Sequence, residues 1–183
     1  PYSFEFEKEN AGVIISWMDF RLLIGILGSA VLVAGVANTD QRARNILFAI
    51  GNAYMFLYAL IGYLWGGPIF FLILQIFIAL STLCMLFKIP DRYDTPILVI
   101  GGLALFGWSL TLFQDYTTAI FVVGLALLGI GFAMQSGSLK REMALCIGSI
   151  VIALFSFLMR DWVFTGLNVL FAAFTLANVR RLA

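Results

Sequence analysis

The sequence predicts an all-α polytopic membrane protein with seven transmembrane helices, on two observations: its composition and the spacing of its polar clusters. Of its 183 residues, 62% are hydrophobic and 11% are charged, and the mean hydropathy is +1.03. A soluble domain is usually near half apolar and a quarter charged. A soluble domain of this size also needs polar cover for its surface. Most of this chain must therefore face lipid.

Polar clusters divide the chain into seven apolar stretches, each close to the length of about 17–25 residues that a transmembrane helix needs. We expect spans over residues 22–37, 45–65, 69–87, 96–113, 117–134, 143–159 and 162–179. Strands of a membrane barrel need only about ten residues of alternating character. These stretches are roughly twice as long and apolar on all sides, so they predict helices. The short connections make neighbouring helices antiparallel.

Positive charges are divided unequally between the two sides of the membrane. The loops on the N-terminal side carry three, Lys8, Arg21 and Arg160. The loops on the other side carry eight, namely Arg42, Arg44, Lys88, Arg92, Lys140, Arg141, Arg180 and Arg181. Because short loops rich in Lys and Arg stay in the cytoplasm, we expect the N-terminus outside and the C-terminus in the cytoplasm, most simply in a bacterial inner membrane.

The segment before the first span, residues 1–21, alternates aromatic and polar side chains at its start, as in Tyr2, Phe4 and Phe6. Aromatic rings favour the headgroup level of a bilayer. We therefore interpret residues 1–21 as an N-terminal interfacial segment.

The remainder of the chain carries signs of an internal repeat. Adding 97 to a position in the first two spans pairs similar residues, which are Arg44 with Arg141, Gly51 with Gly148 and Trp65 with Trp162. In the third span the offset becomes 93, as expected if the turn at 66–68 is longer than its counterpart. At this offset Phe71, Gln75, Ala79 and Thr82 pair with Phe164, Asn168, Ala172 and Thr175.

This pattern predicts two three-helix repeats, 22–87 and 117–183, joined by a linker helix with its loops at 88–116. One connecting helix returns the second repeat to the orientation of the first, so the repeats are parallel. Glycines recur in the first helix of each repeat and permit close helix contact. They are Gly25, Gly28 and Gly35, then Gly124, Gly129 and Gly131.

Several absences exclude classes of function. The chain has no histidine, which removes Ser-His catalysis and most zinc sites. We expect no Asp or Glu deep in a span, and Arg160-Asp161 to be a solvated turn. A net charge of +1 gives no sign of the excess of positive charge that is typical of proteins that bind nucleic acid. Cys84 and Cys146 lie in apolar runs and are interpreted as packing residues. We predict no enzyme, no catalytic residue, no metal and no cofactor.

Neutral polar side chains are what the spans offer instead. The spacing of Gln75 and Thr82, and of Asn168 and Thr175, puts each pair on one helix face. Such groups commonly hydrogen-bond helix to helix. A primary amide, however, has more donors and acceptors than one helix contact satisfies, so Gln75 and Asn168 are candidates to bind a polar solute. The other candidate substrate-binding residues are Thr82, Thr175, Asn52, Tyr58, Trp65 and Trp162.

The layout resembles that of the SWEET and PnuC group of small transporters, two three-helix bundles with one linker helix. Ser16-Trp17-Met18-Asp19, followed by Gly25 and Gly28, is similar to the start of PnuC-type vitamin transporters. The resemblance implies facilitated diffusion of a neutral or weakly charged solute through a central site lined by amides and aromatic rings. SWEET members carry a proline in the repeat helices, often as Pro-Gln. Here Pro68, Pro90 and Pro96 are expected at turns or helix starts.

The sequence thus predicts a facilitative transporter for a small, largely uncharged polar solute that is vitamin- or sugar-like. Its partners would be the lipid bilayer and this solute, and association with a second copy of the chain or with another protein is left open. The alternative is a structural or regulatory membrane subunit that binds a protein partner through its acidic and aromatic N-terminal segment.

Overall fold

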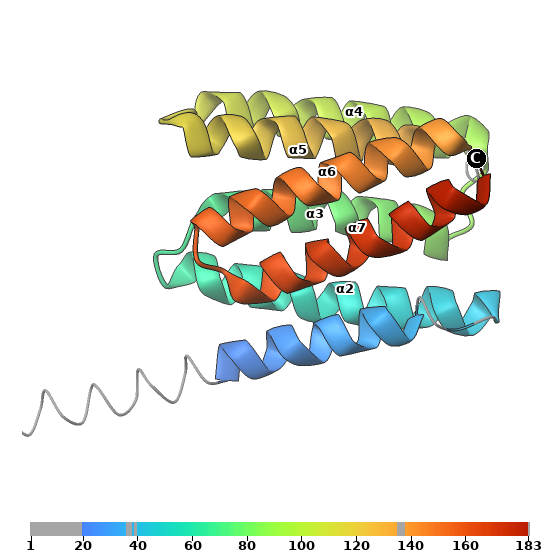
Figure 1. Ribbon diagram of the computed structural model, residues 1–183, viewed down its shortest axis with the longest axis horizontal. Coiled ribbons are helices and arrows are strands. Elements are labelled where there is room, and N and C mark those ends of the chain that lie inside the picture. Colours follow the sequence, from blue (N-terminus) through green and yellow to red (C-terminus); the bar gives the residue numbers. More distant parts are fainter. Residues whose placement is uncertain (1–19, 36–37, 39, 135–137, 183) are drawn as a thin grey trace, which may run out of the picture. The chain divides into compact units, whose positions relative to one another are not determined.

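The computed structural model describes residues 20–35, 38, 40–134 and 138–182, and these ranges contain seven helices and no strand (Figure 1). The first helix is Phe20–Gly35. The others are α2 (Gln41–Leu64), α3 (Ile69–Leu86), α4 (Asp91–Thr111), α5 (Tyr116–Ala133), α6 (Leu139–Leu158) and α7 (Trp162–Leu182). The prediction of an all-helical chain is confirmed. The interfacial segment and the motif at 16–19 lie outside the described residues, apart from Phe20 and Arg21.

Six of these helices, α2 to α7, are long and apolar enough to cross a membrane. The described part of the first helix would extend roughly 24 Å, against a hydrocarbon core of about 30 Å. The residues on both sides of Phe20–Gly35 lie outside the described ranges. The chain is therefore an integral membrane protein with six candidate spans among its described residues, one fewer than predicted.

Several helices begin earlier than the apolar stretches do. α6 starts at Leu139 because the Ser138 hydroxyl accepts a hydrogen bond from the Arg141 backbone N–H at 3.3 Å. This start brings Glu142 into the first turn, where it is 5% exposed. Glu142 lies at the start of α6 and not deep in the span, so the expectation of no Asp or Glu deep in a span is not contradicted, but the burial of this carboxylate was not predicted. α4 likewise starts at Asp91 and contains Pro96, which we had expected at a helix start.

The chain divides into two compact units, Pro1–Gly67 and Pro68–Ala183. In the first unit, glycines let the helix Phe20–Gly35 approach α2. A Cβ on Gly28 would lie 2.9 Å from the Tyr54 Cβ, and one on Gly51 would lie 2.6 Å from the Leu32 Cγ. Real Cβ atoms do not approach so closely, so the helix contact requires these glycines. This role was predicted for Gly28 and not for Gly51.

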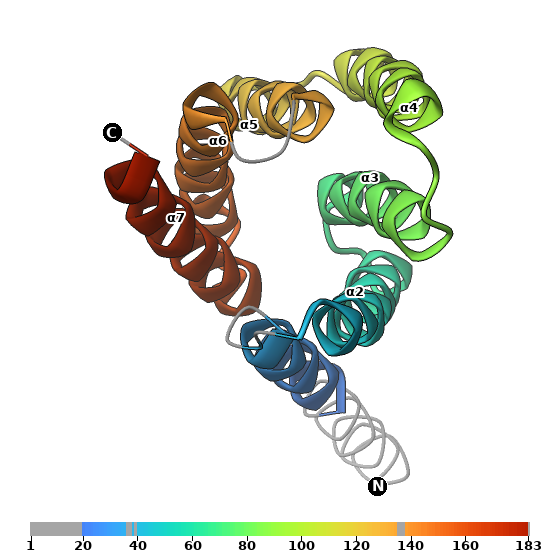
Figure 2. The ribbon, with the colours of Figure 1, turned by 90° about the vertical axis from the view of Figure 1, so that its right-hand side faces the viewer.

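In the second unit, helices that follow one another in the chain also pack together, and α3 additionally contacts α5. Figure 2 shows α4 to α7 in this order, with α3 beside α4. Glycines again mediate one contact. A Cβ on Gly124 would lie 2.7 Å from the Ile152 Cδ1, and one on Gly148 would lie 3.0 Å from Leu128.

Three helices end in the same tight turn, which has one residue of positive φ. These residues are Gly66 at 85°, Lys88 at 49° and Arg160 at 57°. After α6, the Asp161 N–H bonds to the Ser156 carbonyl at 2.9 Å, and the Asp161 carboxylate accepts from the Phe164 N–H at 3.1 Å. Asp161 is 8% exposed. It is a buried cap of α7, not part of a solvated turn.

The same turns correct one pairing of the predicted repeat. Trp65 is the C-cap residue of α2, whereas Trp162 is the first residue of α7. The two tryptophans therefore do not occupy matching positions. α2 has 24 residues and α6 has 20, so a longer helix accounts for much of the change in offset that we had assigned to the turn.

Candidate functional site

Five phenylalanines join four helices at one end of the second unit. Phe70 and Phe71 come from the start of α3, and the others are Phe121, Phe155 and Phe164. The rings of Phe71 and Phe164 stack, with centroids 4.5 Å apart and planes at 4°. Phe155 of α6 contacts both α3 rings, at 5.8 and 5.4 Å. These aromatic contacts link α3 to α5, α6 and α7.

Gln75 and Asn168 lie one helical turn beyond this aromatic cluster. Gln75 follows Phe71 by four residues on α3, and Asn168 follows Phe164 by four residues on α7. α3 and α7 run in the same direction (Figure 1). Residues four apart share a helix face, so both amides follow the stacked rings at the same level. Both are buried, with exposed fractions of 1% and 7%.

The hydroxyls and one amide of this region donate to their own helices. Asn168 Nδ2 donates to the Phe164 carbonyl at 2.8 Å. The Thr82 hydroxyl donates to the Ile78 carbonyl at 2.8 Å, and the Thr175 hydroxyl donates to the Phe171 carbonyl at 2.9 Å. These bonds follow the i to i−4 pattern that Ser and Thr often adopt in helices. The donors are thereby used within α3 and α7.

Gln75 differs from its neighbours. Its Oε1 is buried and has no hydrogen-bond partner within the described ranges, a property that it shares there with only one other side-chain atom, Asp94 Oδ1. An unpaired buried acceptor costs about 1–3 kcal/mol. Buried polar groups are nearly always paired, with protein or with ordered water. Among the polar side chains of this region, Gln75 is therefore the one whose buried acceptor lacks a hydrogen-bond donor.

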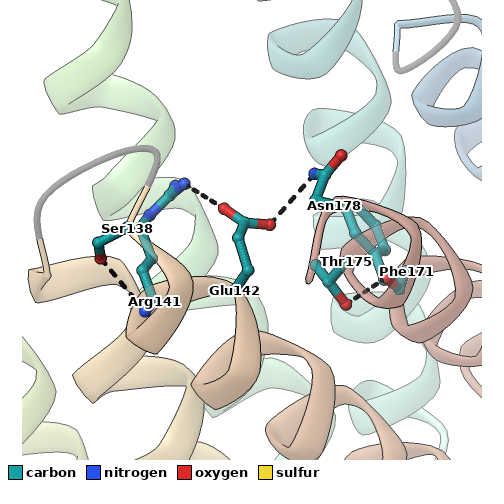
Figure 3. Close-up of polar contacts among 6 residues, drawn as sticks. All are labelled: Ser138, Arg141, Glu142, Phe171, Thr175 and Asn178. Carbon is teal, nitrogen blue, oxygen red and sulfur yellow. Dashed lines mark hydrogen bonds and ion pairs between the residues drawn. The ribbon is translucent and has the colours of Figure 1, made fainter. Parts of the chain in front are cut away.

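Glu142 is the polar residue that the sequence interpretation missed (Figure 3). Its Oε1 accepts from Arg141 Nη1 at 2.9 Å, and its Oε2 accepts from Asn178 Nδ2 at 3.1 Å. The second bond ties the first turn of α6 to the end of α7. Asn178 follows Thr175 by three residues and continues the stripe of Asn168 and Thr175.

A spacing signal for Glu142 was present in the sequence. The buried small and polar residues of α6 recur at alternating steps of four and three, which is one helix face. They are Glu142, Cys146, Ser149, Ala153 and Ser156.

The remaining predicted site residues lie elsewhere. Asn52, Tyr58 and Trp65 belong to the first unit, where Tyr58 is buried and Asn52 is half-buried. The Arg21 guanidinium lies over the Tyr58 ring, 4.3 Å from its centroid. Trp65 and Trp162 are 52% and 65% exposed, positions typical of an interfacial aromatic belt. In the second unit, Gln75, Thr82, Asn168 and Thr175 are the candidates that are buried.

Within the described parts of the chain, no group of three or more Cys, Asp or Glu side chains is arranged to hold a metal ion. No protein-family model, no curated protein and no solved structure matches this chain.

Proposed function

We propose that this integral membrane protein is a facilitative transporter for a small, largely uncharged polar solute, and that Gln75 and Asn168 contact the solute. The observation that carries the proposal is the unpaired Gln75 Oε1, buried in a helix long enough to span the bilayer. In lipid, an unsatisfied polar group has no water to replace its partner. A solute that supplies the hydrogen bond explains why an amide stands at this position.

Charge supports an uncharged solute. Along α3 and α7, the residues that follow the aromatic cluster up to Thr82 and Thr175 include no acidic or basic side chain. Moving an ion through such surroundings is costly because nothing compensates its charge. Amide and hydroxyl groups between apolar walls suit a neutral polar solute.

We further propose the two parallel three-helix repeats. Gly28 meets Met55 across the first helix pair, and Gly124 meets Ile152 across α5 and α6. The two glycines are 96 residues apart, and their two partners are 97 apart. Gly51 against Leu32 and Gly148 against Leu128 follow the same offsets. Two pairs of helices that pack through matching positions favour a duplicated unit.

The distribution of positive charge supports an N-terminus outside and a C-terminus in the cytoplasm, as in a bacterial inner membrane. In that orientation the aromatic cluster lies toward the outer face. It would close the second unit there, while Glu142 and Asn178 would lie toward the cytoplasm.

Osmotic swelling of proteoliposomes tests the transport proposal. Vesicles are mixed with iso-osmolar urea, acetamide, glycerol or glucose, and the light-scattering change gives the solute flux. We expect the flux of at least one solute to exceed that of protein-free vesicles. Gln75→Leu and Asn168→Leu should each reduce this flux about tenfold, because the loss of one hydrogen bond costs about 1.4 kcal/mol and this energy corresponds to a factor of ten.

The matched control is Asn45→Leu, the same amide-to-leucine change in the other unit, which should leave the flux unchanged. Flux that is unchanged by both Gln75→Leu and Asn168→Leu would contradict the proposal that these two residues contact the solute. Absence of flux for every solute would favour the structural-subunit alternative.

A further inference from the structure

We infer that the solute carries an amide-like edge, an N–H next to a carbonyl, and that it binds with this edge against Gln75. The inference rests on the proposed transport function and adds the chemical class of the solute. It follows from which hydrogen-bonding atoms of the buried amides are already used and which are left.

Gln75 supplies the first half of the pattern. Its Oε1 is unpaired, and no hydrogen bond of the Gln75 side chain is found within the described residues. A primary amide presents an acceptor and two donors side by side. A glutamine uses such a pair when it binds the donor and acceptor edge of an adenine with two parallel hydrogen bonds. The complementary group on a solute is an N–H beside an acceptor, and in a small neutral solute an N–H beside a C=O is the simplest such group.

Asn168 supplies the second half. Its Nδ2 donates to the Phe164 carbonyl at 2.8 Å, which directs one amide donor into α7 and leaves the carbonyl oxygen on the opposite side of the group. The Thr175 hydroxyl hydrogen is likewise used, on the Phe171 carbonyl. The Asn168 oxygen is therefore left as an acceptor at this level of α7, and it can accept a hydrogen bond from a further N–H or O–H of the solute.

Both requirements are met by a primary amide or a urea. Its carbonyl accepts from Gln75 Nε2, one N–H donates to Gln75 Oε1, and a second N–H remains for the Asn168 oxygen. A ketone of the same shape satisfies only the first of these bonds. A tertiary amide also lacks both N–H donors. Among solutes of similar size, selectivity should therefore depend on the N–H groups.

Cyclohexanecarboxamide and cyclohexyl methyl ketone form a matched pair of probes, because an NH2 group replaces a methyl group of similar size. Each is titrated against the purified full-length protein in detergent, and the shift of the thermal unfolding midpoint gives an apparent affinity. We expect the amide to bind at least about tenfold more tightly than the ketone, the effect of one or more hydrogen bonds. Gln75→Leu should abolish this difference, whereas Asn45→Leu should retain it.

Equal stabilisation by the two probes, a difference that survives Gln75→Leu, or no stabilisation by the amide would each overturn the inference. The swelling assay separates this failure from that of the transport proposal. Glycerol flux that depends on Gln75, together with no preference for the amide, would retain the transporter and reject the solute class.

Discussion

The rings of Phe71 and Phe164 stack face to face with their centroids 4.5 Å apart, and so join the start of α3 to the start of α7. The backbones of α3 and α7 do not adjoin within the described residues, since α3 approaches α4 and α5. In a bilayer, helices associate through packing rather than through the hydrophobic effect. This stack is thus a principal contact between the helices that carry Gln75 and Asn168.

A double-mutant cycle measures that contact. Phe71→Ala and Phe164→Ala should each destabilise the protein, and the pair should show a coupling energy of about 0.5–1.5 kcal/mol, the value typical of stacked aromatic rings. Unfolding in mixed micelles gives the free energies. Phe157→Ala, at an exposed ring outside the cluster, is the control and should not couple to Phe71→Ala. Additive effects of Phe71→Ala and Phe164→Ala would contradict the role of the stack.

Gln75→Leu should stabilise the solute-free protein. The substitution removes a buried acceptor without a partner, whose cost is about 1–3 kcal/mol, and replaces it by an apolar side chain of similar size. The free energy of unfolding without solute is the quantity to measure. A loss of stability would mean that Gln75 has a structural hydrogen bond, and it would remove the main support for a solute site.

Glu142 and Asn178 should couple energetically, because their 3.1 Å hydrogen bond joins the first turn of α6 to the end of α7. Glu142→Gln keeps a bond to Asn178 but loses the ion pair with Arg141, and should cost less than Glu142→Ala. We expect a loss of about 1.5–3 kcal/mol for Glu142→Ala, the range for hydrogen bonds to a charged group. If Glu142→Ala were as stable as the unchanged protein, the bridge would have no role in holding α6 and α7.

Asp115 should make stability depend on pH in the acid range. The Thr117 hydroxyl donates to Asp115 Oδ1 at 2.6 Å and the Thr118 backbone N–H donates at 3.0 Å, and these bonds hold the pKa of Asp115 below its usual value. The folded protein then binds the proton less readily than the unfolded chain. Its stabilisation is complete above the unfolded pKa, near 3.9, and disappears as the pH falls through the lower folded pKa.

Melting temperatures between pH 6 and pH 2.5 test this effect. Asp115→Asn should flatten the part of the acid decline that is due to Asp115, since an amide does not titrate in this range. Identical acid profiles for the two proteins would show that the capping bonds of α5 do not stabilise the carboxylate.

Much of the fold follows from the positions of the polar clusters, which separate the six candidate spans correctly. The helix boundaries could not be predicted in the same way. An apolar stretch indicates which residues lie in lipid, whereas the helix extends beyond it into polar residues until it reaches its capping residue. Asp40 and Ser138 set the starts of α2 and α6, several residues before the apolar stretches begin.

The candidate site was predictable only in part. The spacing of Gln75 with Thr82 and of Asn168 with Thr175 indicates two polar faces, and all four residues are buried. Which amide is left without a hydrogen bond to its own helix depends on side-chain rotamers, because Asn168 Nδ2 donates to the Phe164 carbonyl and Gln75 makes no such bond. Glu142 was missed because a charged residue next to Arg141 was interpreted as part of a loop.

The most direct test of the central claim is the solute flux of proteoliposomes that contain the unchanged protein or the Gln75→Leu variant, at equal amounts of inserted protein. The account predicts flux of a small neutral solute through the unchanged protein and about a tenfold lower flux through a stably folded Gln75→Leu variant. Equal flux through both, or no flux above protein-free vesicles through either, would contradict it.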